Sequence, residues 1–330
     1  MKSRSVVSII LALAAASTVS VQARQGAVYY HTDGAKLPVF YQLVEKELPS
    51  IGFSVTDPHK KINDAYKQKY GSTVMDTLDF FPIVQEKKLQ ALLEKEPRLA
   101  GFNPFDLYSY KRKNEHNLHV GHLTPETILD ILKINDRSIR EAYTATFTDL
   151  DALLQKKLGG TISFIEYDAL PDDTMMDFEI TVDRSKDLGD WIDDFQEKFE
   201  EVFEEKHYII AGFWNFKEAY EDSPNHFAMY DAFWTYSLCH FTFSYNMFDH
   251  ENGRPEAGIF APCTMYMYIK KGSDTLVIGM PRLANWQAVH SIKDPRKVEM
   301  IRDLDKEIPA IMREALGARE IASDPGSKGK

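Results

Sequence analysis

The chain repeats itself once, and this repeat constrains the fold more than any other feature of the sequence. Residues 102–110 align without a gap on residues 260–268, which lie 158 positions later. The same spacing then relates Gly121 to Gly279. Aromatic, proline and glycine positions that stay in step over two strands and their hairpin indicate two copies of one folding unit.

Each copy is predicted to run strand, helix, strand, strand, helix, strand, strand. In the second copy a strand at 178–182 precedes a helix whose apolar stripe contains Phe195, Phe199 and Phe203, and a further strand follows at 208–213. Hairpins and closely linked strands dominate, so the sheets should be mostly antiparallel with helices packed on one face. The predicted class is α+β, with two similar units.

The chain divides into five predicted segments. They are a signal peptide at 1–23, a first unit at 24–135, a connector at 136–177, a second unit at 178–316 and a disordered tail at 317–330. The connector is expected to hold one short helix and an acidic, proline-containing loop. The end of the tail has no apolar side chain to bury, which favours disorder.

The first residues are typical of a secretory signal. Lys2 and Arg4 precede an apolar run at 6–15, and the motif at 21–23 has small residues at the two positions that a signal peptidase reads. The run is too short to cross a bilayer, so cleavage before Arg24 should release a soluble protein. In a Gram-negative cell this predicts a periplasmic location without stable membrane insertion.

Charge and missing motifs exclude several classes of function. The formal net charge is −11, and clustered Lys and Arg, which nucleic acids and anionic lipids require, are not found. The sequence also lacks glycine-rich nucleotide loops, the hydrolase elbow, the zinc-protease helix motif and the c-type haem motif. An enzyme is therefore not indicated, and no catalytic residue is predicted.

Several short motifs resemble the bacterial domain of unknown function 302 family. In the first unit they are the helix end and strand at 43–53, the strand end at 78–82 and the strand start at 102–104. In the second unit they lie at 238–241 and 262–266, and this copy is closer to the family pattern. The resemblance implies two tandem copies of a small sheet-and-helix domain similar to the TATA-binding-protein fold, with no established activity.

Cys239 and Cys263 are the two cysteines of the chain, and both lie at motif positions of the second unit. The first unit has Asp79 and Phe105 instead. In an oxidising compartment a disulfide between neighbouring strands would close a loop of about 25 residues and contribute about 3 kcal/mol. Two buried free thiols are an alternative, and a reactive pair is less favoured because neither a Cys-x-x-Cys spacing nor an adjacent cation is evident.

A soft-metal site is the second chemical hypothesis for this region. In an extended strand Cys263, Met265 and Met267 point to one face, and Cys239 and His240 lie on a strand nearby. Sulfur ligands of this kind suit Cu(I). Methionine is also common filler in a packed sheet, so a core role is the favoured interpretation and copper the alternative.

His116, His119 and His122 are close in sequence but are not expected to bind a metal. On one strand His116 and His122 would share a face while His119 points the opposite way, so the three nitrogens would not converge. Exposed strand or hairpin histidines are predicted.

The sequence therefore favours a non-catalytic, exported, two-domain protein that binds a small ligand or a periplasmic protein through its second unit. The alternative is a periplasmic redox or copper-handling protein that uses Cys239, Cys263, Met265 and Met267. The identity of the ligand and the oligomeric state have no signal in the sequence.

Overall fold

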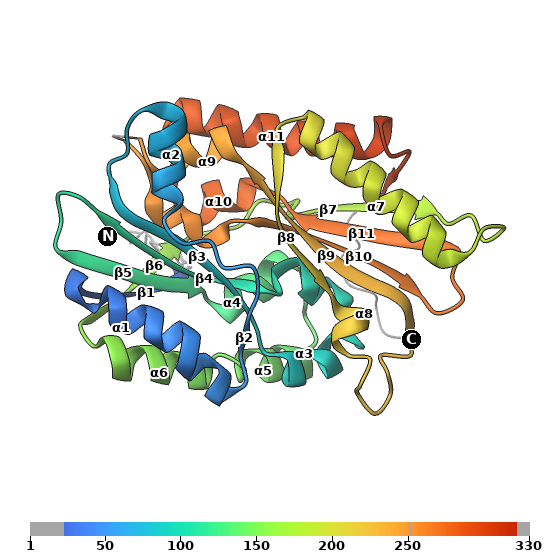
Figure 1. The fold of residues 1–330 in the computed structure, drawn as a ribbon, viewed down its shortest axis with the longest axis horizontal. Coiled ribbons are helices and arrows are strands. Elements are labelled where there is room, and N and C mark those ends of the chain that lie inside the picture. The colour runs from blue at the N-terminus through green and yellow to red at the C-terminus, as the bar shows by residue number, and fades with distance from the viewer. Residues whose placement is uncertain (1–22, 251, 322–330) are drawn as a thin grey trace, which may run out of the picture.

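The computed structural model describes residues 23–250 and 252–321 of the chain, and two six-stranded antiparallel sheets form its centre (Figure 1). The first sheet contains β1 (Arg24–Asp33), β2 (Ser54–Val55), β3 (Met75–Val84), β4 (Phe105–Arg112), β5 (Asn117–Leu123) and β6 (Thr161–Tyr167). The second contains β7 (Met175–Thr181), β8 (Tyr208–Asn215), β9 (Tyr230–His240), β10 (Cys263–Lys270), β11 (Thr275–Pro281) and β12 (Arg319–Ile321).

The two sheets have the same topology. The strand order is β2-β3-β4-β5-β1-β6 in the first sheet and β8-β9-β10-β11-β7-β12 in the second. Adding six to each strand number of the first sheet gives the second. The predicted α+β class with two similar units is therefore confirmed, and residues of the two units that lie 158 positions apart are called equivalent below.

Helices pack on the outer side of each sheet and at the junction of the two units. They are α1 (Leu37–Gln42), α2 (Ile62–Tyr70), α3 (Glu86–Leu93), α4 (Pro125–Ile131), α5 (Arg137–Thr144), α6 (Thr148–Leu158), α7 (Leu188–Glu205), α8 (Phe216–Ala219), α9 (Phe241–Phe248), α10 (Ala284–Val289) and α11 (Pro295–Glu314). Figure 1 shows α1 and α6 on one side of the molecule, α7 and α11 on the opposite side, and the sheets between them.

The alternation of side chains along each strand decides which face is covered. On α7 the predicted stripe of Phe195, Phe199 and Phe203 is buried, and the Phe199 ring lies 4.7 Å from the ring of Tyr236 on β9. Tyr236 is opposite Met265 in the β9–β10 register, so both belong to this outer face. The inner faces carry the other set of side chains and meet at the unit interface.

Two short 3-10 segments hold the units together. η4 (Pro97–Phe102) of the first unit packs on β10, and η5 (Pro255–Phe260) of the second packs on β4. The hydroxyl of Tyr108, on the inner face of β4, donates a hydrogen bond of 2.7 Å to the Pro255 carbonyl. The phenyl rings of Phe102 and Phe260, which are equivalent, meet with their centres 6.4 Å apart. The interface thus relates the two units reciprocally.

The expected boundaries differ from the elements of the structure. The range 136–177, expected as a connector, contains α5, α6 and β6, and β6 pairs with β1 along 161–167. The range 317–330, expected as a tail, contains β12 at 319–321, which pairs with β7. In both cases a short segment gains its backbone hydrogen bonds by extending the edge of an existing sheet.

The predicted signal peptide at 1–23 lies almost entirely outside the described residues, as does the end of the predicted tail at 322–330. β1 begins at Arg24. Within residues 23–250 and 252–321, no helix combines the length and the apolar character that crossing a bilayer would need.

Candidate ligand site between the two units

A half-open cavity of about 120 Å³ lies where α2 and β3 of the first unit meet β8, β9 and α9 of the second. Figure 1 shows α2 beside α9, and the rings of Tyr70 and Tyr245 on these helices stack at 4.1 Å. The apolar part of the lining includes Ile62, Phe80, Ile209, Ile210, Phe241 and Phe248. The polar part is His59, Tyr66, Cys239 and Ser244.

Local sequence places the two helices around this cavity. α2 begins after Lys61, whose left-handed backbone (φ 55°) turns the chain and whose N–H donates to the Asp79 carboxylate at 2.8 Å. α9 begins after His240, whose Nδ1 accepts a hydrogen bond of 3.2 Å from the N–H of Phe243. His240, a predicted ligand residue, is therefore a helix cap at the edge of the site.

The polar groups gather at one end of the cavity. The buried Tyr66 hydroxyl donates to Ser244 Oγ at 2.8 Å, and Ser244 Oγ donates to the Phe241 carbonyl at 2.9 Å. Cys239 Sγ lies 3.9 Å from Ser244 Oγ. His59 Nε2 lies 2.5 Å from the Ala211 carbonyl and so links the first unit to β8. These hydrogen bonds leave an apolar chamber with a hydroxyl and a thiol at one end.

Cys239 is the predicted site residue that lines this cavity. Burial raises the pKa of its thiol to about 11, with a smaller opposing effect from the hydrogen bond to Ser244. The sulfur is therefore a neutral thiol at neutral pH, and a thiol is a poor nucleophile and a weak metal ligand. This environment favours a packing or ligand-contact role for Cys239.

The predicted disulfide is not formed, since both cysteines are free. Cys263 is opposite Leu238 in the β9–β10 register, and Cys239 is the next residue along β9. Successive side chains of a strand point to opposite faces, so Cys239 faces the unit interface while Cys263 faces the outer helices. The prediction placed the two residues on neighbouring strands correctly but did not take the register into account.

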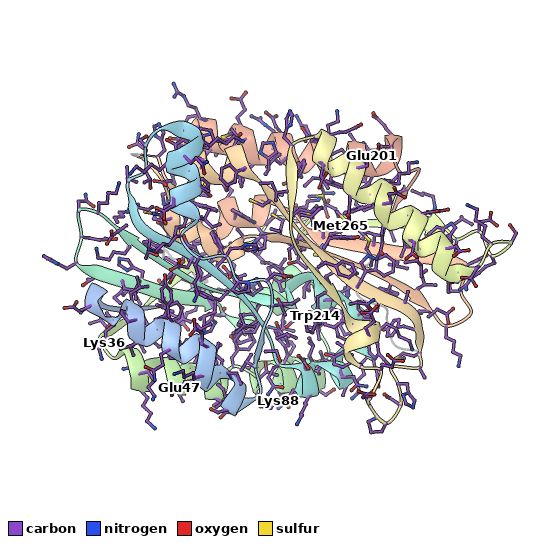
Figure 2. All side chains as sticks on the ribbon, in the orientation of Figure 1. Lys36, Glu47, Lys88, Glu201, Trp214 and Met265 are labelled. Carbon is purple, nitrogen blue, oxygen red and sulfur yellow. The ribbon has the colours of Figure 1, made fainter. Side chains whose placement is uncertain are left out.

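The residues predicted as possible Cu(I) ligands are likewise divided between the two faces of the second sheet. Met265 and Met267 are fully buried on the outer face with Cys263, as the strand periodicity predicted. Figure 2 shows Met265 on β10 beneath the outer helices. Cys239 lies on the other side of the sheet, and burial raises the pKa of Cys263 above its ordinary value. Among the described residues, no three His, Cys, Asp or Glu side chains form a group suited to a metal ion.

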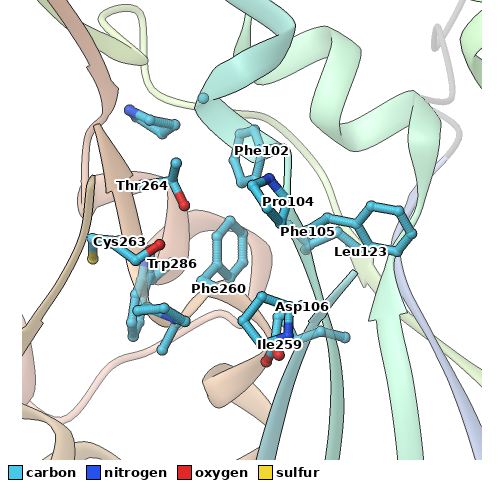
Figure 3. A pocket seen from close by; sticks show the side chains of 16 residues that line it. Phe102, Pro104, Phe105, Asp106, Leu123, Ile259, Phe260, Cys263, Thr264 and Trp286 are labelled. Carbon is cyan, nitrogen blue, oxygen red and sulfur yellow. The ribbon is translucent and has the colours of Figure 1, made fainter. Parts of the chain in front are cut away.

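A second cavity, enclosed and about 30 Å³ in volume, lies at the centre of the unit interface. Figure 3 shows Phe102, Pro104 and Asp106 of the first unit facing Ile259 and Phe260 of the second. A cavity of this volume has room for about two water molecules. Ala261 and Pro262 line both this cavity and the larger one.

Asp106 is the unusual residue of the enclosed cavity. It is 9% exposed, and neither carboxylate oxygen has a hydrogen-bond partner among the described residues. Burial holds the pKa of Asp106 well above its ordinary value. The backbone amide of Phe81 lowers this pKa by a smaller amount, and the negative charge of Asp79 raises it further. A neutral carboxyl group is the form that such a site accommodates.

The three clustered histidines do not converge, and the predicted exposure is correct for His116 but wrong for His122. His122 is fully buried, and its Nε2 lies 2.9 Å from Asp151 Oδ1 on α6. His119 lies on the other face, stacked on Tyr110. Asp151 was not predicted as a partner of His122, because it lies in the range expected as a connector.

Sequence reasoning missed the first-unit wall of the larger cavity. His59 and Tyr66 line it, yet the prediction assigned the site to the second unit alone. The single available signal was the Ala-Tyr pair at 65–66, which is echoed at 219–220. A cavity between two units depends on how they dock, which local patterns do not encode.

Comparisons with known proteins give one structural similarity. No protein-family model matches the chain, and no curated protein does. A crystal structure of an uncharacterized conserved protein, DUF302 from Bacillus stearothermophilus, is similar to part of the chain at 18% sequence identity and a TM-score of 0.33. The similarity covers 42% of this chain and 97% of the other.

Proposed function

We propose that the chain is a non-catalytic binding protein that takes up a small, mainly apolar ligand in the cavity between its two units. The observation that carries the proposal is the half-open cavity of about 120 Å³ with hydrocarbon walls and a hydroxyl and a thiol at one end. An apolar cavity of about 150 Å³ in another protein takes up benzene. A ligand of one aromatic ring, or a short alkyl chain, fits this volume.

The polar end sets the preferred orientation of such a ligand. Ser244 Oγ already donates to the Phe241 carbonyl and accepts from Tyr66, and its second lone pair receives the weak 3.9 Å hydrogen bond of the Cys239 thiol, which a stronger donor can displace. A ligand hydroxyl could donate to that oxygen while its ring contacts Phe80 and Phe248. A phenol-like molecule should therefore bind more tightly than a hydrocarbon of the same size.

The absence of an activated nucleophile among the lining residues supports binding over catalysis. Cys239 is held as a neutral thiol by burial, with its pKa at about 11, and His59 Nε2 is engaged by the Ala211 carbonyl. A copper or redox site would need Cys239 beside Cys263, Met265 and Met267. Cys239 lies on the opposite face of the second sheet from the other three, which disfavours such a site.

The experiment is a titration of the protein with phenol and, separately, with toluene. Binding is detected by calorimetry and by the shifts of side-chain methyl signals in NMR spectra. Saturable one-to-one binding is expected, with phenol tighter. Ile62→Trp extends a larger ring from α2 into the cavity and should abolish binding. Leu153→Trp is the matched control, because Leu153 is also a half-buried helical residue but lies on α6.

Two results would reject the proposal. One is a lack of saturable binding by either probe. The other is unchanged affinity in a folded Ile62→Trp variant, which would mean that the probes bind elsewhere. Circular dichroism establishes that both variants are folded before they are compared.

We also propose that the protein is exported and that its two units are tandem relatives of the domain of unknown function 302 family. Export is supported by the charged and apolar pattern at 2–15 and the small residues at 21–23. Intact mass measurement of protein made in a Gram-negative host should give an N-terminus at Arg24. The family relation is supported by the motifs at 78–82 and 262–266, and an alignment of further homologues would test it.

A further inference from the structure

A second concave surface lies on the inner face of the second sheet, away from the apolar cavity. This groove has a volume of about 300 Å³ and runs between η4 of the first unit and strands β7, β10 and β11. Its floor is formed by Tyr266 and Tyr268, whose rings stand nearly parallel with centres 6.3 Å apart. It is called the tyrosine groove below.

Basic side chains outnumber acidic ones around the tyrosine groove. Lys95, Lys133, Lys270 and Arg98 line it, against Glu96 and Asp177. Arg98 and Glu96 neutralise each other through two hydrogen bonds of 2.7 Å. This leaves a local excess of positive charge on a chain whose formal net charge is −11.

The three lysines retain donors for a ligand. Lys95 and Lys270 are exposed, and neither forms an ion pair within residues 23–250 and 252–321. Lys133 donates one hydrogen bond of 3.0 Å to the Asp172 carbonyl, and an ammonium group has three donors. An anion held between them would be contacted from both units, because Lys270 lies on β10 and Lys95 lies beside η4.

The equivalent surface of the first unit is filled by side chains. Gly121 is paired with Tyr29, whereas its equivalent Gly279 is paired with Asp177. In the first unit the Tyr29 ring covers Gly121, and its hydroxyl donates to the Glu256 carbonyl at 2.6 Å. In the second unit the ring of Tyr266 covers Gly279 from the neighbouring strand and donates to Asp177 at 3.4 Å, so the position of Asp177 carries no ring of its own. The fold permits closure of this surface, so the opening in the second unit is a property of its own side chains.

A second substitution acts in the same direction. His119 stacks on Tyr110 with ring centres 4.6 Å apart. The equivalent pair in the second unit is Val277 and Tyr268, so an aliphatic side chain stands where the first unit has a stacked imidazole, and Tyr268 is 8% exposed. The Tyr268 hydroxyl has no hydrogen-bond partner among the described residues, which makes it a further donor beside the lysines.

We propose that the tyrosine groove binds a small polyvalent anion, a polycarboxylate or a phosphate compound, through Lys95, Lys133, Lys270 and the Tyr268 hydroxyl. The site is separate from the apolar cavity and does not depend on the function proposed for it. A monovalent anion engages one lysine at a time, whereas a polyvalent anion bridges two or three. Binding should weaken as salt rises, because the lysines are near the surface.

Calorimetric titration at low ionic strength tests this with inorganic pyrophosphate and with citrate as the probes. Saturable one-to-one binding is expected for at least one of them, and the tighter probe identifies the phosphate or the carboxylate class. Lys95→Gln and Lys270→Gln should each lower the affinity about threefold or more, and the double variant about tenfold, as expected for near-surface ion pairs. Lys156→Gln on α6, an exposed lysine without an ion pair, is the control and should change nothing.

A substitution that fills the tyrosine groove with a larger side chain tests the proposal independently of the lysines. Val277→Phe places a ring beside Tyr268, where the first unit has His119 beside Tyr110, and should abolish binding while thermal unfolding stays cooperative. The proposal is overturned if neither probe binds saturably. It is also overturned if binding in the double lysine variant equals that of the unaltered protein, or if Lys156→Gln lowers affinity as much as the groove variants do.

Discussion

The two units share their backbone plan but differ where their inner faces meet solvent or each other. Both have the same strand order, and each places a proline-led 3-10 segment on the other's sheet. The first unit fills its inner face with Tyr29 and His119, while the second leaves the tyrosine groove open. The comparison teaches that the shared topology fixes the docking of the units, and that a few side chains decide which surface is available to a ligand.

Buried polar residues show the same contrast. The enclosed cavity has Asp106 from the first unit, and the equivalent residue of the second is Thr264. After α10 the second unit has His290, and the equivalent residue after α4 is Leu132. The following residues, Lys133 and Ser291, both have left-handed backbones, so the local geometry is the same. Exchanging residues between units therefore tests side-chain chemistry on a constant frame.

The largest expected effect comes from His290. Both ring nitrogens lack partners among the described residues, and burial, aided by Arg254, lowers the pKa of His290 to about 3. Below a pH of about 6.5 the unfolded chain binds a proton that the folded chain refuses, so stability falls as the pH falls from about 6.5 to 3. At pH 4 this loss should reach about 3 kcal/mol.

His290→Leu, which copies Leu132, should remove that loss. Chemical denaturation of both proteins at intervals from pH 7 to pH 4 measures it, and the difference between the two curves isolates His290 from the carboxylates that titrate in the same range. If the free energies of unfolding of the unaltered protein and of His290→Leu changed with pH in the same way, His290 would be protonated or solvated in the folded protein.

The second effect concerns the reciprocal 3-10 segments. A Cβ atom at Gly258 would lie 2.5 Å from the Tyr108 ring, whereas one at Gly101 would lie 3.3 Å from Leu132 and 3.4 Å from Tyr266. Gly258→Ala should therefore cost about 2 kcal/mol through overpacking, and Gly101→Ala less than about 1 kcal/mol. Urea unfolding of the two variants measures the difference, and equal costs would contradict the asymmetric packing of η4 and η5.

Several of these features could be predicted from the sequence, and others could not. The repeat, the α+β class and the buried stripe of Phe195, Phe199 and Phe203 follow from local periodicity, which the structure retains. The disulfide between Cys239 and Cys263 failed because pairing register, set by non-local contacts, decides the face of each residue. Edge strands such as β6 are short and weakly patterned, so their pairing partner determines whether they form.

A smaller effect is expected for Asp106. Its pKa is raised in the folded protein, so the unfolded chain releases its proton near pH 4 while the folded chain retains it. Stability should therefore fall as pH rises above about 4, until the folded group also ionises. Asp106→Asn keeps the shape without the charge and should stabilise the protein by about 1 to 2 kcal/mol at pH 7.

The groups that face Asp106 also titrate and must be considered in this test. Tyr29 and Tyr108 are close on the inner face. Asp79 lies on the next strand and points to the outer side, and Cys263 is a lining residue whose thiol also points to the outer helices. The tyrosines and the thiol have raised pKa values and stay neutral between pH 4 and pH 8. Over that range the free energy of unfolding, measured by denaturation and plotted against pH, should fall for the unaltered protein and should change less for Asp106→Asn. Identical slopes would assign the pH dependence to the other carboxyl groups whose pKa values burial raises, which are Asp79, Asp249 and Asp305.

The smallest effect concerns an ion pair that the two units build with exchanged partners. Glu96 and Arg98 flank Pro97 in the first unit, and the equivalent residues around Pro255 are Arg254 and Glu256, also paired. Each pair spans a proline, so the backbone is the same and only the sign at each position differs. Glu96→Arg places two guanidinium groups together and should cost about 1 kcal/mol.

Exchanging both residues, with Glu96→Arg and Arg98→Glu, should restore the stability to within about 0.5 kcal/mol, because the new pair copies the one in the second unit. A double-mutant cycle by thermal or urea unfolding measures the coupling. The exchanged pair stays neutral, as the Glu96–Arg98 pair is, so pyrophosphate binding in the tyrosine groove should be unchanged. Restored stability with weakened anion binding would show that the guanidinium at position 98 contributes to the groove beyond the three lysines.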